Sequence, residues 1–350
     1  AAGGHNNAYT SNDLTVYQDW FPRSALETVF ELESERLQNL AFDPEAIESE
    51  RGVIASERRT TVDNNNVSKL VEQVRATAYV AHPYQFPIIG WPSDIASWTQ
   101  EDLESFYETY YAPNNITMVV VGDVTPDEVF ELAEDYLEDI PAQEPPADVR
   151  TVEPEQQGER RVVIETDAQT PMLHVAFHAG AAADPETLAM RLLLSILVYG
   201  DSARLHRLFV EEEQLAISLG AFPFEGFDPG LVYFYATLPP GGDLGLLEQR
   251  LFEELARVAE EGVSEAELEK ARNIALAEFW GVMSTINGKA ASLGEAAVFH
   301  GSYEKLFDFA QDIEAVSGET LKMIARRVFR RDNATIGMLF TPAVEAEAEE

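Results

Sequence analysis

Apolar and polar positions alternate along the chain with two periods, one of three to four residues and one of two. The longer period is that of an amphipathic helix, whereas the shorter period and short apolar runs are typical of strands. Helices are predicted over 23–40, 44–81 with a polar break at 63–66, 99–111, 125–138, 184–199, 201–214, 243–261, 264–296, 303–315 and 317–330. Strands are predicted over 7–21, 116–124, 160–166, 172–181, 334–342 and, around a Gly/Pro turn, within 216–238.

A proline-rich acidic stretch divides this series of elements into two parts. Residues 141–160 hold four prolines among many acids, which is typical of a linker. The chain has 350 residues, so each part is long enough to bury a core of its own. We expect a first domain over 1–140, a linker over 141–160 and a second domain over 161–342. The acidic run 343–350 is predicted to be a disordered tail.

The two parts share a weak internal repeat. Residues 99–123 align with 317–341 without a gap at an offset of 218, which places Asn115 on Asn333. Such self-similarity indicates a duplication. The fold class we expect is α+β, in two homologous domains that each hold a mostly antiparallel sheet packed with helices.

A second match, at an offset of 221, concerns charged residues. The run DPEAIESERGVIASE in the first part aligns with SEAELEKARNIALAE in the second. Function usually resides in one copy of a duplication, so a difference between the copies points to the copy that carries it. The match pairs Arg51 with Arg272, Glu57 with Glu278, and Glu50 with Ala271.

Glu50 and Glu57 lie seven residues apart in a predicted helix. Seven residues turn through about 700°, within about 20° of two full turns, so both carboxylates share one face. A pair of this kind is most often a solvated acidic face, because most glutamates on helices are solvated. The spacing alone leaves both interpretations open.

The charge of the chain restricts its partners. Its net charge is −38, from 62 acidic against 24 basic residues, of which only five are Lys. So negative a field argues against nucleic acid or an anionic membrane as a partner. Many acids with little Lys also suggest adaptation to high salt, where screening weakens the self-repulsion. A halophilic protein would lose stability in low salt.

Other residue types exclude further chemistry. The chain has no cysteine, which removes disulfides, thiolate metal sites and a Cys nucleophile. No apolar run reaches 18 residues, so we expect no membrane-spanning helix. His174 and His178 lie four apart in a predicted strand, about 13 Å from each other, which is too far for one metal ion. We expect both to be structural.

Three segments together resemble a known family. They are GGHNNAYTSNDLTVY (3–17), ESERGVIASERR (48–59) and HPYQFPIIGWPSDIASWTQEDLESFYETYYAPNNITMVVVGD (82–123). In order and spacing they are similar to the insulinase/pitrilysin zinc peptidases, the inverzincins, which include the mitochondrial processing peptidase. The resemblance runs over nearly the whole chain and implies a processing-peptidase-like duplication.

The resemblance also implies a zinc site. The family binds zinc through the two His of an H-x-x-E-H helix, whose Glu activates the metal-bound water. The third ligand is the final Glu of a later segment E-R-x-x-x-x-x-E. That ligand matches Glu57, and the first Glu of the segment matches Glu50. Glu50 would not bind the metal itself but would orient the ligands and add negative charge near them.

The chain departs from the family because it contains no H-x-x-E-H. In the family that motif lies roughly eighty residues before the third ligand, which places it about two dozen residues before Ala1. We therefore expect the first domain to lack its start and zinc binding to require that missing segment. These 350 residues alone would not form a competent zinc enzyme, since a catalytic site needs about three protein ligands.

A second departure lies in the other half. Active members of the family carry an Arg and a Tyr seven residues apart that bind and polarise the substrate. The matching positions here are Val210 and Ile217, so both groups are absent. In bacterial relatives the zinc motif and the Arg/Tyr pair can sit on separate subunits. The expected partner is therefore a homologous subunit that carries the pair, or a second copy of this chain.

The substrate implied by the resemblance is a peptide or an unfolded polypeptide. In the family the strand after GG adds the peptide as an extra strand inside a closed chamber. The matching residues are Asn7, Ala8, Tyr9 and Thr10.

Two functions from different classes follow. One is a zinc-dependent endopeptidase subunit, and the other is a catalytically silent homologue with a scaffold or chamber-forming role. Glu50 and Glu57 favour the first, whereas Val210 and Ile217 favour silence of the second half-site. An unrelated α+β binding protein is the third interpretation. The location expected is periplasmic or secreted rather than cytoplasmic.

Overall fold

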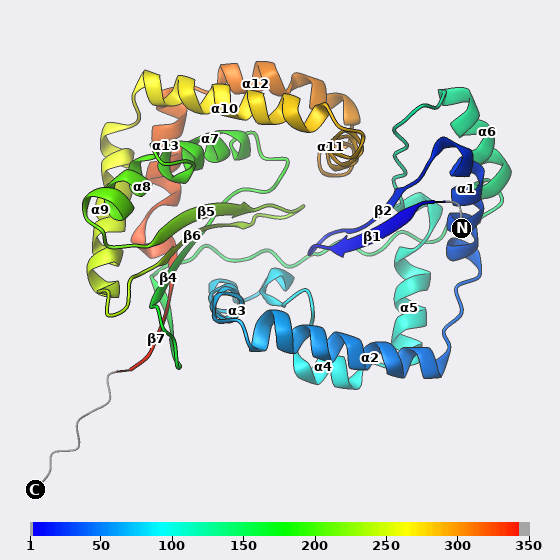
Figure 1. The fold of residues 1–350 in the computed structure, drawn as a ribbon, viewed down its shortest axis with the longest axis horizontal. Coiled ribbons are helices and arrows are strands. Elements are labelled where there is room, and N and C mark those ends of the chain that lie inside the picture. The colour runs from blue at the N-terminus through cyan, green and yellow to red at the C-terminus, as the bar shows by residue number, and fades with distance from the viewer. Residues whose placement is uncertain (1–2, 343–350) are drawn as a thin grey trace, which may run out of the picture. The chain divides into compact units, whose positions relative to one another are not determined.

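The structure is a computed structural model that describes residues 3–342 (Figure 1). It consists of two compact units, and each draws on both halves of the sequence. Unit 1 comprises Ala1–Arg58, Ile88–Arg150 and Phe279–Phe307, and unit 2 comprises Arg59–Pro87, Thr151–Glu278 and Asp308–Glu350.

Unit 1 is mostly helical in its described residues. Within residues 3–342 its one β-ladder is an antiparallel hairpin of two strands. Its elements are β1 (His5–Thr10), β2 (Thr15–Trp20), η1 (Arg23–Ala25), α1 (Leu26–Gln38), α2 (Pro44–Arg58), α4 (Pro92–Ser97), α5 (Gln100–Tyr110), η4 (Pro113–Asn115), α6 (Pro126–Leu137) and α11 (Ile286–Phe299). Helix α10 (Glu265–Met283) and η6 (Tyr303–Asp308) run across the boundary between the units.

Unit 2 is built on a mixed five-stranded sheet of order β3-β7-β4-β6-β5 (Figure 1). The β3–β7 pair is parallel and the other three pairs are antiparallel. The strands are β3 (Arg160–Glu165), β4 (Met172–His178), β5 (Ser218–Phe224), β6 (Leu231–Thr237) and β7 (Ala334–Phe340). The remaining elements are η2 (Arg59–Asp63), α3 (Asn66–Ala78), η3 (Pro83–Gln85), α7 (Thr187–Val198), α8 (Arg204–His206), η5 (Arg207–Glu212), α9 (Leu244–Glu261), α12 (Phe309–Ala315), α13 (Gly318–Val328) and η7 (Arg331–Asn333).

Helices cover both faces of this sheet. Helices α7, α9 and α13 bury one face in the main core, in which Leu193, Phe177 and Leu255 are fully buried. Helix α3 covers the other face with Leu70 and Val74. Apolar side chains on both faces of the sheet are therefore removed from water. This burial is the main favourable contribution to the stability of the sheet.

The helix that covers the second face comes from the first half of the sequence. The segment 59–87, which holds α3, belongs to unit 2, whereas 279–307, which holds α11, belongs to unit 1. The two segments lie 220 residues apart at both ends, close to the offsets of the sequence repeat. The helices that the predicted repeat pairs, α3 and α11, thus belong to the unit that holds most of the other half of the sequence.

One contact of α3 and one contact of α11 are consistent with this equivalence. In unit 2, Val74 of α3 packs against Gly337 of β7, where an added Cβ would lie 2.2 Å from Val74 Cγ2. In unit 1 the glycine is on the helix, because a Cβ on Gly294 of α11 would meet Val119 at 3.7 Å. By the predicted repeat, Val119 corresponds to Gly337. The glycine of the contact is therefore on β7 in unit 2 and on the helix α11 in unit 1.

Most of the predicted helices and the strands of the second half are confirmed, but four predictions need correction. The strand predicted over 7–21 is a hairpin, in which a turn closes with the Ser11 N–H donating to Leu14 O at 2.7 Å. The helix predicted over 264–296 is two helices, because Thr285 caps the start of α11 by accepting from Gly288 N. Over 201–214 there are only the short α8 and the π-turn η5.

The fourth correction is the strand predicted over 116–124. Residues 116–121 form no ladder in the described part of the chain. Backbone pairing, not the apolar pattern alone, makes a strand, and no neighbouring strand pairs with this segment. The tail 343–350 lies outside the described residues.

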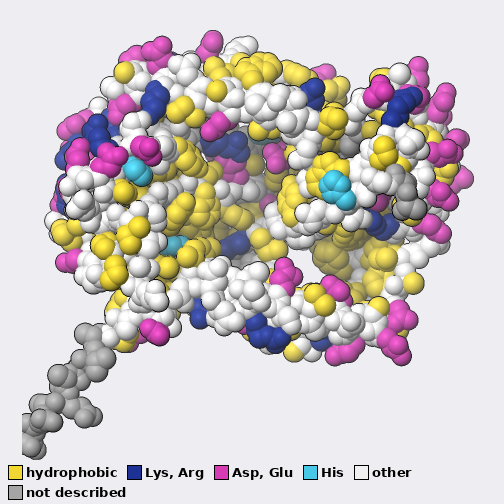
Figure 2. All heavy atoms as spheres, in the orientation of Figure 1, with side chains coloured by type: hydrophobic (Ala, Val, Ile, Leu, Met, Phe, Trp, Pro, Cys, Tyr) yellow, Lys and Arg dark blue, Asp and Glu magenta, His cyan; other side chains and the backbone are white. Residues whose placement is uncertain are grey.

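The expected α+β class is confirmed, with a mixed sheet packed with helices in unit 2. The helix-packed sheet expected in the first domain as well is, among residues 3–342, only the two-stranded hairpin β1–β2. The division of the sequence at 141–160 stays a prediction. No helix among residues 3–342 is long and apolar enough to cross a membrane. Figure 2 shows Asp and Glu side chains spread over the visible face of each unit.

Candidate functional site

Glu50 and Glu57 both lie on α2, and both side chains are exposed. The helix starts where the Asp43 carboxylate accepts the N–H groups of Glu45 and Ala46, at 2.8 and 3.0 Å. That contact satisfies two of the backbone donors that a helix start leaves unpaired. The helix is continuous from 44 to 58, so the predicted common face for the two glutamates holds.

Two arginines directly follow the two glutamates and anchor α2 to the segment 88–98. The Arg51 guanidinium donates to Ile95 O at 2.7 Å and to Trp98 O at 2.9 Å. It also lies 3.8 Å from the centre of the Trp98 ring. Arg58, which is buried, donates to Gly90 O at 2.8 Å. The arginines thus bind α2 to its neighbours, and the glutamates lie about 100° around the helix from them.

The carboxylates are of a type that zinc accepts, but they do not form a complete site. Carboxylate oxygen is a known zinc ligand, and a catalytic zinc has about three protein ligands. Among residues 3–342 no group of three His, Cys, Asp or Glu side chains could hold a metal ion. Glu50 and Glu57 alone therefore supply too few ligands to hold a catalytic zinc ion.

The predicted peptide-binding residues lie on β1. Asn7, Ala8, Tyr9 and Thr10 are all exposed, and β1 pairs with β2 alone in the described chain. The opposite edge of β1 therefore presents backbone N–H and C=O groups to which an extended peptide can add. Partial burial raises the pKa of Tyr9, and the Glu295 carboxylate on α11 raises it further. The tyrosine therefore stays neutral at physiological pH.

Val210 and Ile217 belong to unit 2, whereas the glutamates and β1 belong to unit 1. Val210 lies in η5 and packs against the main core. Ile217 is exposed and interacts through its backbone, since its N–H donates to Thr237 O at 2.7 Å. Neither side chain can hydrogen-bond to a substrate.

The two strand histidines are structural, as predicted. His174 is buried on β4, and burial lowers its pKa to about 4. His178 lies against Ala78 O at 2.9 Å through Nε2, and burial lowers its pKa as well. Both rings are therefore neutral near pH 7, and His178 links β4 to Ala78 at the end of α3.

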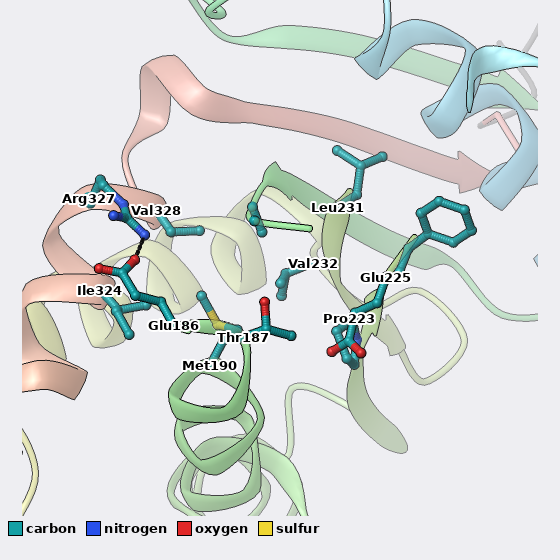
Figure 3. Close-up of a pocket in the computed structure, with 13 residues that line it drawn as sticks. Glu186, Thr187, Met190, Pro223, Glu225, Leu231, Val232, Ile324, Arg327 and Val328 are labelled. Atoms are coloured by element: carbon teal, nitrogen blue, oxygen red, sulfur yellow. Dashed lines mark hydrogen bonds and ion pairs between the residues drawn. The ribbon is translucent and has the colours of Figure 1, made fainter. Parts of the chain in front are cut away.

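A small pocket of unit 2 is separate from these residues (Figure 3). It is lined mainly by apolar side chains, among them Met190, Leu231 and Val232, and the Glu186–Arg327 ion pair borders it. Its volume is about 20 Å³, which is room for about one water molecule. A peptide or cofactor does not fit there.

Reasoning from the sequence missed Arg51 and Arg58 as structural partners of the glutamates. The signal was present, because SER occurs at 49–51 and again at 56–58, seven residues apart. Residues at this spacing share a helix face, so each glutamate and each arginine has an equivalent two turns along. The carbonyl groups that the arginines bind could not be read from a pattern.

Comparisons with known proteins agree with this structure. The curated "Zinc protease PqqE" of Helicobacter pylori is 27% identical over 336 residues, which are 95% of this chain and 76% of that protein. "Probable mitochondrial-processing peptidase subunit beta" of Arabidopsis thaliana is 25% identical over 346 residues, 95% of this chain and 64% of that protein.

Solved structures show the same fold. A protease from Helicobacter pylori superposes with a TM-score of 0.92 at 27% identity, over 97% of this chain and 83% of that one. The periplasmic protease PqqL from Escherichia coli shares the fold with a TM-score of 0.76 at 21% identity, over 99% of this chain and 40% of that one.

Family models complete the comparison. The model described as "Insulinase (Peptidase family M16)" matches residues 1–90, and the model described as "Peptidase M16 inactive domain" matches residues 97–275. The second model alone spans more than half of the chain, and the two together confirm the resemblance to the insulinase family. The chain belongs to the M16 peptidase family.

Proposed function

We propose that this chain is the zinc-side subunit of an M16 endopeptidase. The observation that carries the proposal is the exposed pair Glu50 and Glu57 on one face of α2. Glu57 supplies a carboxylate ligand, and Glu50 supports it with charge and orientation. When bound, zinc supplies a Lewis acid that activates a water molecule for attack on a peptide bond.

The comparison with unit 2 supports a functional interpretation of Glu50. Its equivalent, Ala271, is buried in the main core cluster that also contains α7. No described element of unit 1 corresponds to α7 in the repeat. The helix face that is covered in unit 2 therefore stays open around Glu50, which is the place where further ligands have room to approach.

The remaining ligands would come from a helix equivalent to α7. Shifting α7 by the repeat offset places that helix roughly two to three dozen residues before Ala1. The spacing within the family places the H-x-x-E-H motif in the same stretch. We therefore propose that a segment outside these 350 residues completes the site and that zinc binding depends on it.

The substrate in this proposal is a peptide that adds to β1 as an extra strand. Backbone pairing along Asn7–Thr10 carries little sequence preference, so an unfolded chain binds better than a folded one. The absence of an Arg/Tyr pair at Val210 and Ile217 supports a homologous second subunit that supplies it. The Arabidopsis relative bears the name of a subunit, which is consistent with assembly in pairs.

The alternative is a catalytically silent subunit with a chamber-forming role. Two observations favour it: the apolar residues at 210 and 217, and the match of 97–275 to a model described as an inactive domain. A silent copy has no reason to keep both glutamates, which is why we favour the peptidase. A periplasmic or secreted location is part of the proposal, supported by the fold shared with a periplasmic protease.

The test is peptide cleavage by the complete natural polypeptide with and without its homologous partner. We expect cleavage of an unstructured fluorogenic peptide by the pair, and at least a hundredfold less by either chain alone, because each half-site lacks groups that the other holds. Glu50→Gln in the pair should reduce the rate while much of the metal stays bound. A pair that holds zinc and never cleaves peptides would favour the silent subunit.

A further inference from the structure

The arginines that follow the two glutamates form a double anchor that the other half of the chain has only once. Arg51 donates to the carbonyl groups of Ile95 and Trp98, at the C-terminal end of α4. Its equivalent, Arg272, donates to Val316 O at 2.6 Å and lies 3.4 Å from Glu314 O, at the C-terminal end of α12. One arginine anchor is therefore common to both halves.

The second anchor exists only beside the glutamates. Arg58 donates to Gly90 O and faces the Trp91 ring at 5.6 Å, whereas the equivalent of Arg58 at the offset of 221 is Phe279, which has no cation. The first anchor differs as well. The Arg51 guanidinium stacks on Trp98, and the equivalent of Trp98 is Val316, which has no ring.

Two anchors one heptad apart restrain a helix more than one anchor does. A single anchor fixes one point, and the helix can still turn slightly about its axis. A carboxylate about 6 Å from that axis moves about 1 Å for a turn of 10°. A functional group must be held to within about 0.5 Å to act, so small rotations of α2 matter for Glu50 and Glu57.

We propose that Arg51 and Arg58 are positioning residues that set the rotation of α2 and so aim both glutamates. The carbonyl groups of Gly90, Ile95 and Trp98 are the fixed points, and the rings of Trp91 and Trp98 hold the guanidinium planes. This inference rests on the proposed function for its consequence, the aim of a zinc ligand. Its geometric part concerns these 350 residues alone.

The first experiment compares Arg51→Lys with Arg272→Lys in the complete polypeptide, with the homologous partner present for the kinetic measurements. Lysine keeps the charge but cannot bind two carbonyl groups in one plane or stack as a guanidinium does. We expect both variants to lower the melting temperature, because each loses the shared anchor. Only Arg51→Lys should weaken zinc affinity, by about tenfold in a chelator competition, and lower kcat with little change in KM.

The second experiment measures the helix itself and needs no metal. Residues 1–350 contain no cysteine, so thiol-reactive spin labels attach only to cysteines that are introduced there. The labels are placed on Glu50→Cys of α2 and Glu101→Cys of α5, and the distance between them is measured. We expect a narrow distance distribution that broadens or shifts when Arg51→Lys or Arg58→Lys is added. Arg272→Lys should leave it unchanged.

The outcomes separate this inference from the proposed function. An unchanged distance distribution in Arg51→Lys and Arg58→Lys would overturn the inference, as would equal zinc affinity in Arg51→Lys and Arg272→Lys. A parent protein that binds no zinc would overturn the proposed function, while the distance measurement would still decide whether the arginines set the rotation of α2.

Discussion

Two segments that the predicted repeat makes equivalent differ in strand pairing and in burial between the two units. In unit 2, β7 is the second strand of a five-stranded sheet, and its residues Ala334 and Ile336 are 0% and 1% exposed. In unit 1, the equivalent segment 116–121 forms no ladder, and its residues Ile116 and Met118 are 41% and 47% exposed. The sequences align without a gap, so the difference arises from the neighbours of each segment.

The neighbours of β7 explain the contrast. That strand pairs with β3 on one side and β4 on the other, and neither strand has an equivalent among the described elements of unit 1. An apolar run becomes a strand only where partners accept its backbone hydrogen bonds. In unit 1, Ile116, Met118 and Glu50 are all exposed, whereas their counterparts Ala334, Ile336 and Ala271 are buried in unit 2.

The largest expected effect of a substitution is on stability, at helix α3, which covers the sheet of unit 2. Leu70 of α3 is fully buried, and its equivalent in α11 at an offset of 220 is Ala290. Leu70→Ala should reduce the free energy of unfolding by about 3 kcal/mol, because it removes a packed side chain and leaves a cavity. Urea denaturation followed by circular dichroism measures it, and a loss below about 1 kcal/mol would contradict this account of the core.

A smaller effect, of opposite sign in the two units, is expected at Gly337 and Gly294. Gly337→Ala should cost about 2 kcal/mol, since the new methyl group would lie 2.2 Å from Val74 Cγ2. Gly294→Ala is the matched control. Its methyl group would meet Val119 at an ordinary 3.7 Å, and alanine favours a helix over glycine by about 1 kcal/mol. Denaturation curves that show the same sign for both variants would refute the proposed exchange of the small residue.

The smallest expected effect concerns the start of α10, the equivalent of α2. Hydrogen bonds from Arg204 and Ser264 hold the pKa of Glu267 at about 2, below its ordinary value of 4.5. Because the folded-state pKa is depressed, the stabilisation is full above pH 4.5 and is lost as pH falls toward 2.

The corresponding variant is Glu267→Gln, with stability measured from pH 6 to pH 3. We expect it to be less stable than the parent at pH 6 and to lose less stability on acidification. The start of α2 has Ala46 near the equivalent position, so Glu45→Gln, at an exposed site, serves as a control with little change. A parallel fall of the parent and the Glu267 variant would argue against a stabilising role for this carboxylate.

Several elements could be predicted from the sequence because their signals are local. Thr99 with Asp102 and Thr125 with Glu128 form capping boxes, so α5 and α6 begin where the pattern places them. The hairpin within 5–20 carried a turn signal in Ser-Asn-Asp at 11–13, which the apolar pattern alone did not use. The break at Thr285 between α10 and α11 was likewise visible as a helix cap.

The features that the sequence could not predict depend on distant partners. The assignment of α3 to unit 2 and of α11 to unit 1 follows from packing against sheets that lie far along the chain. The Arg51 anchor depends on carbonyl groups 44 and 47 residues away, which no spacing rule specifies. Of the candidate site, the shared helix face of the two glutamates could be predicted from their spacing, whereas the carbonyl groups that bind the arginines could not.

Zinc content of the complete natural polypeptide tests the central claim most directly, with Glu57→Gln and Glu278→Gln compared. These residues are equivalents in the repeat and both are exposed, so neither change should disturb folding. We expect about one zinc per chain in the parent and in Glu278→Gln, and a loss of most of the metal in Glu57→Gln, because a missing ligand leaves the site short of about three. Full zinc occupancy in Glu57→Gln would contradict the assignment of this glutamate as a ligand.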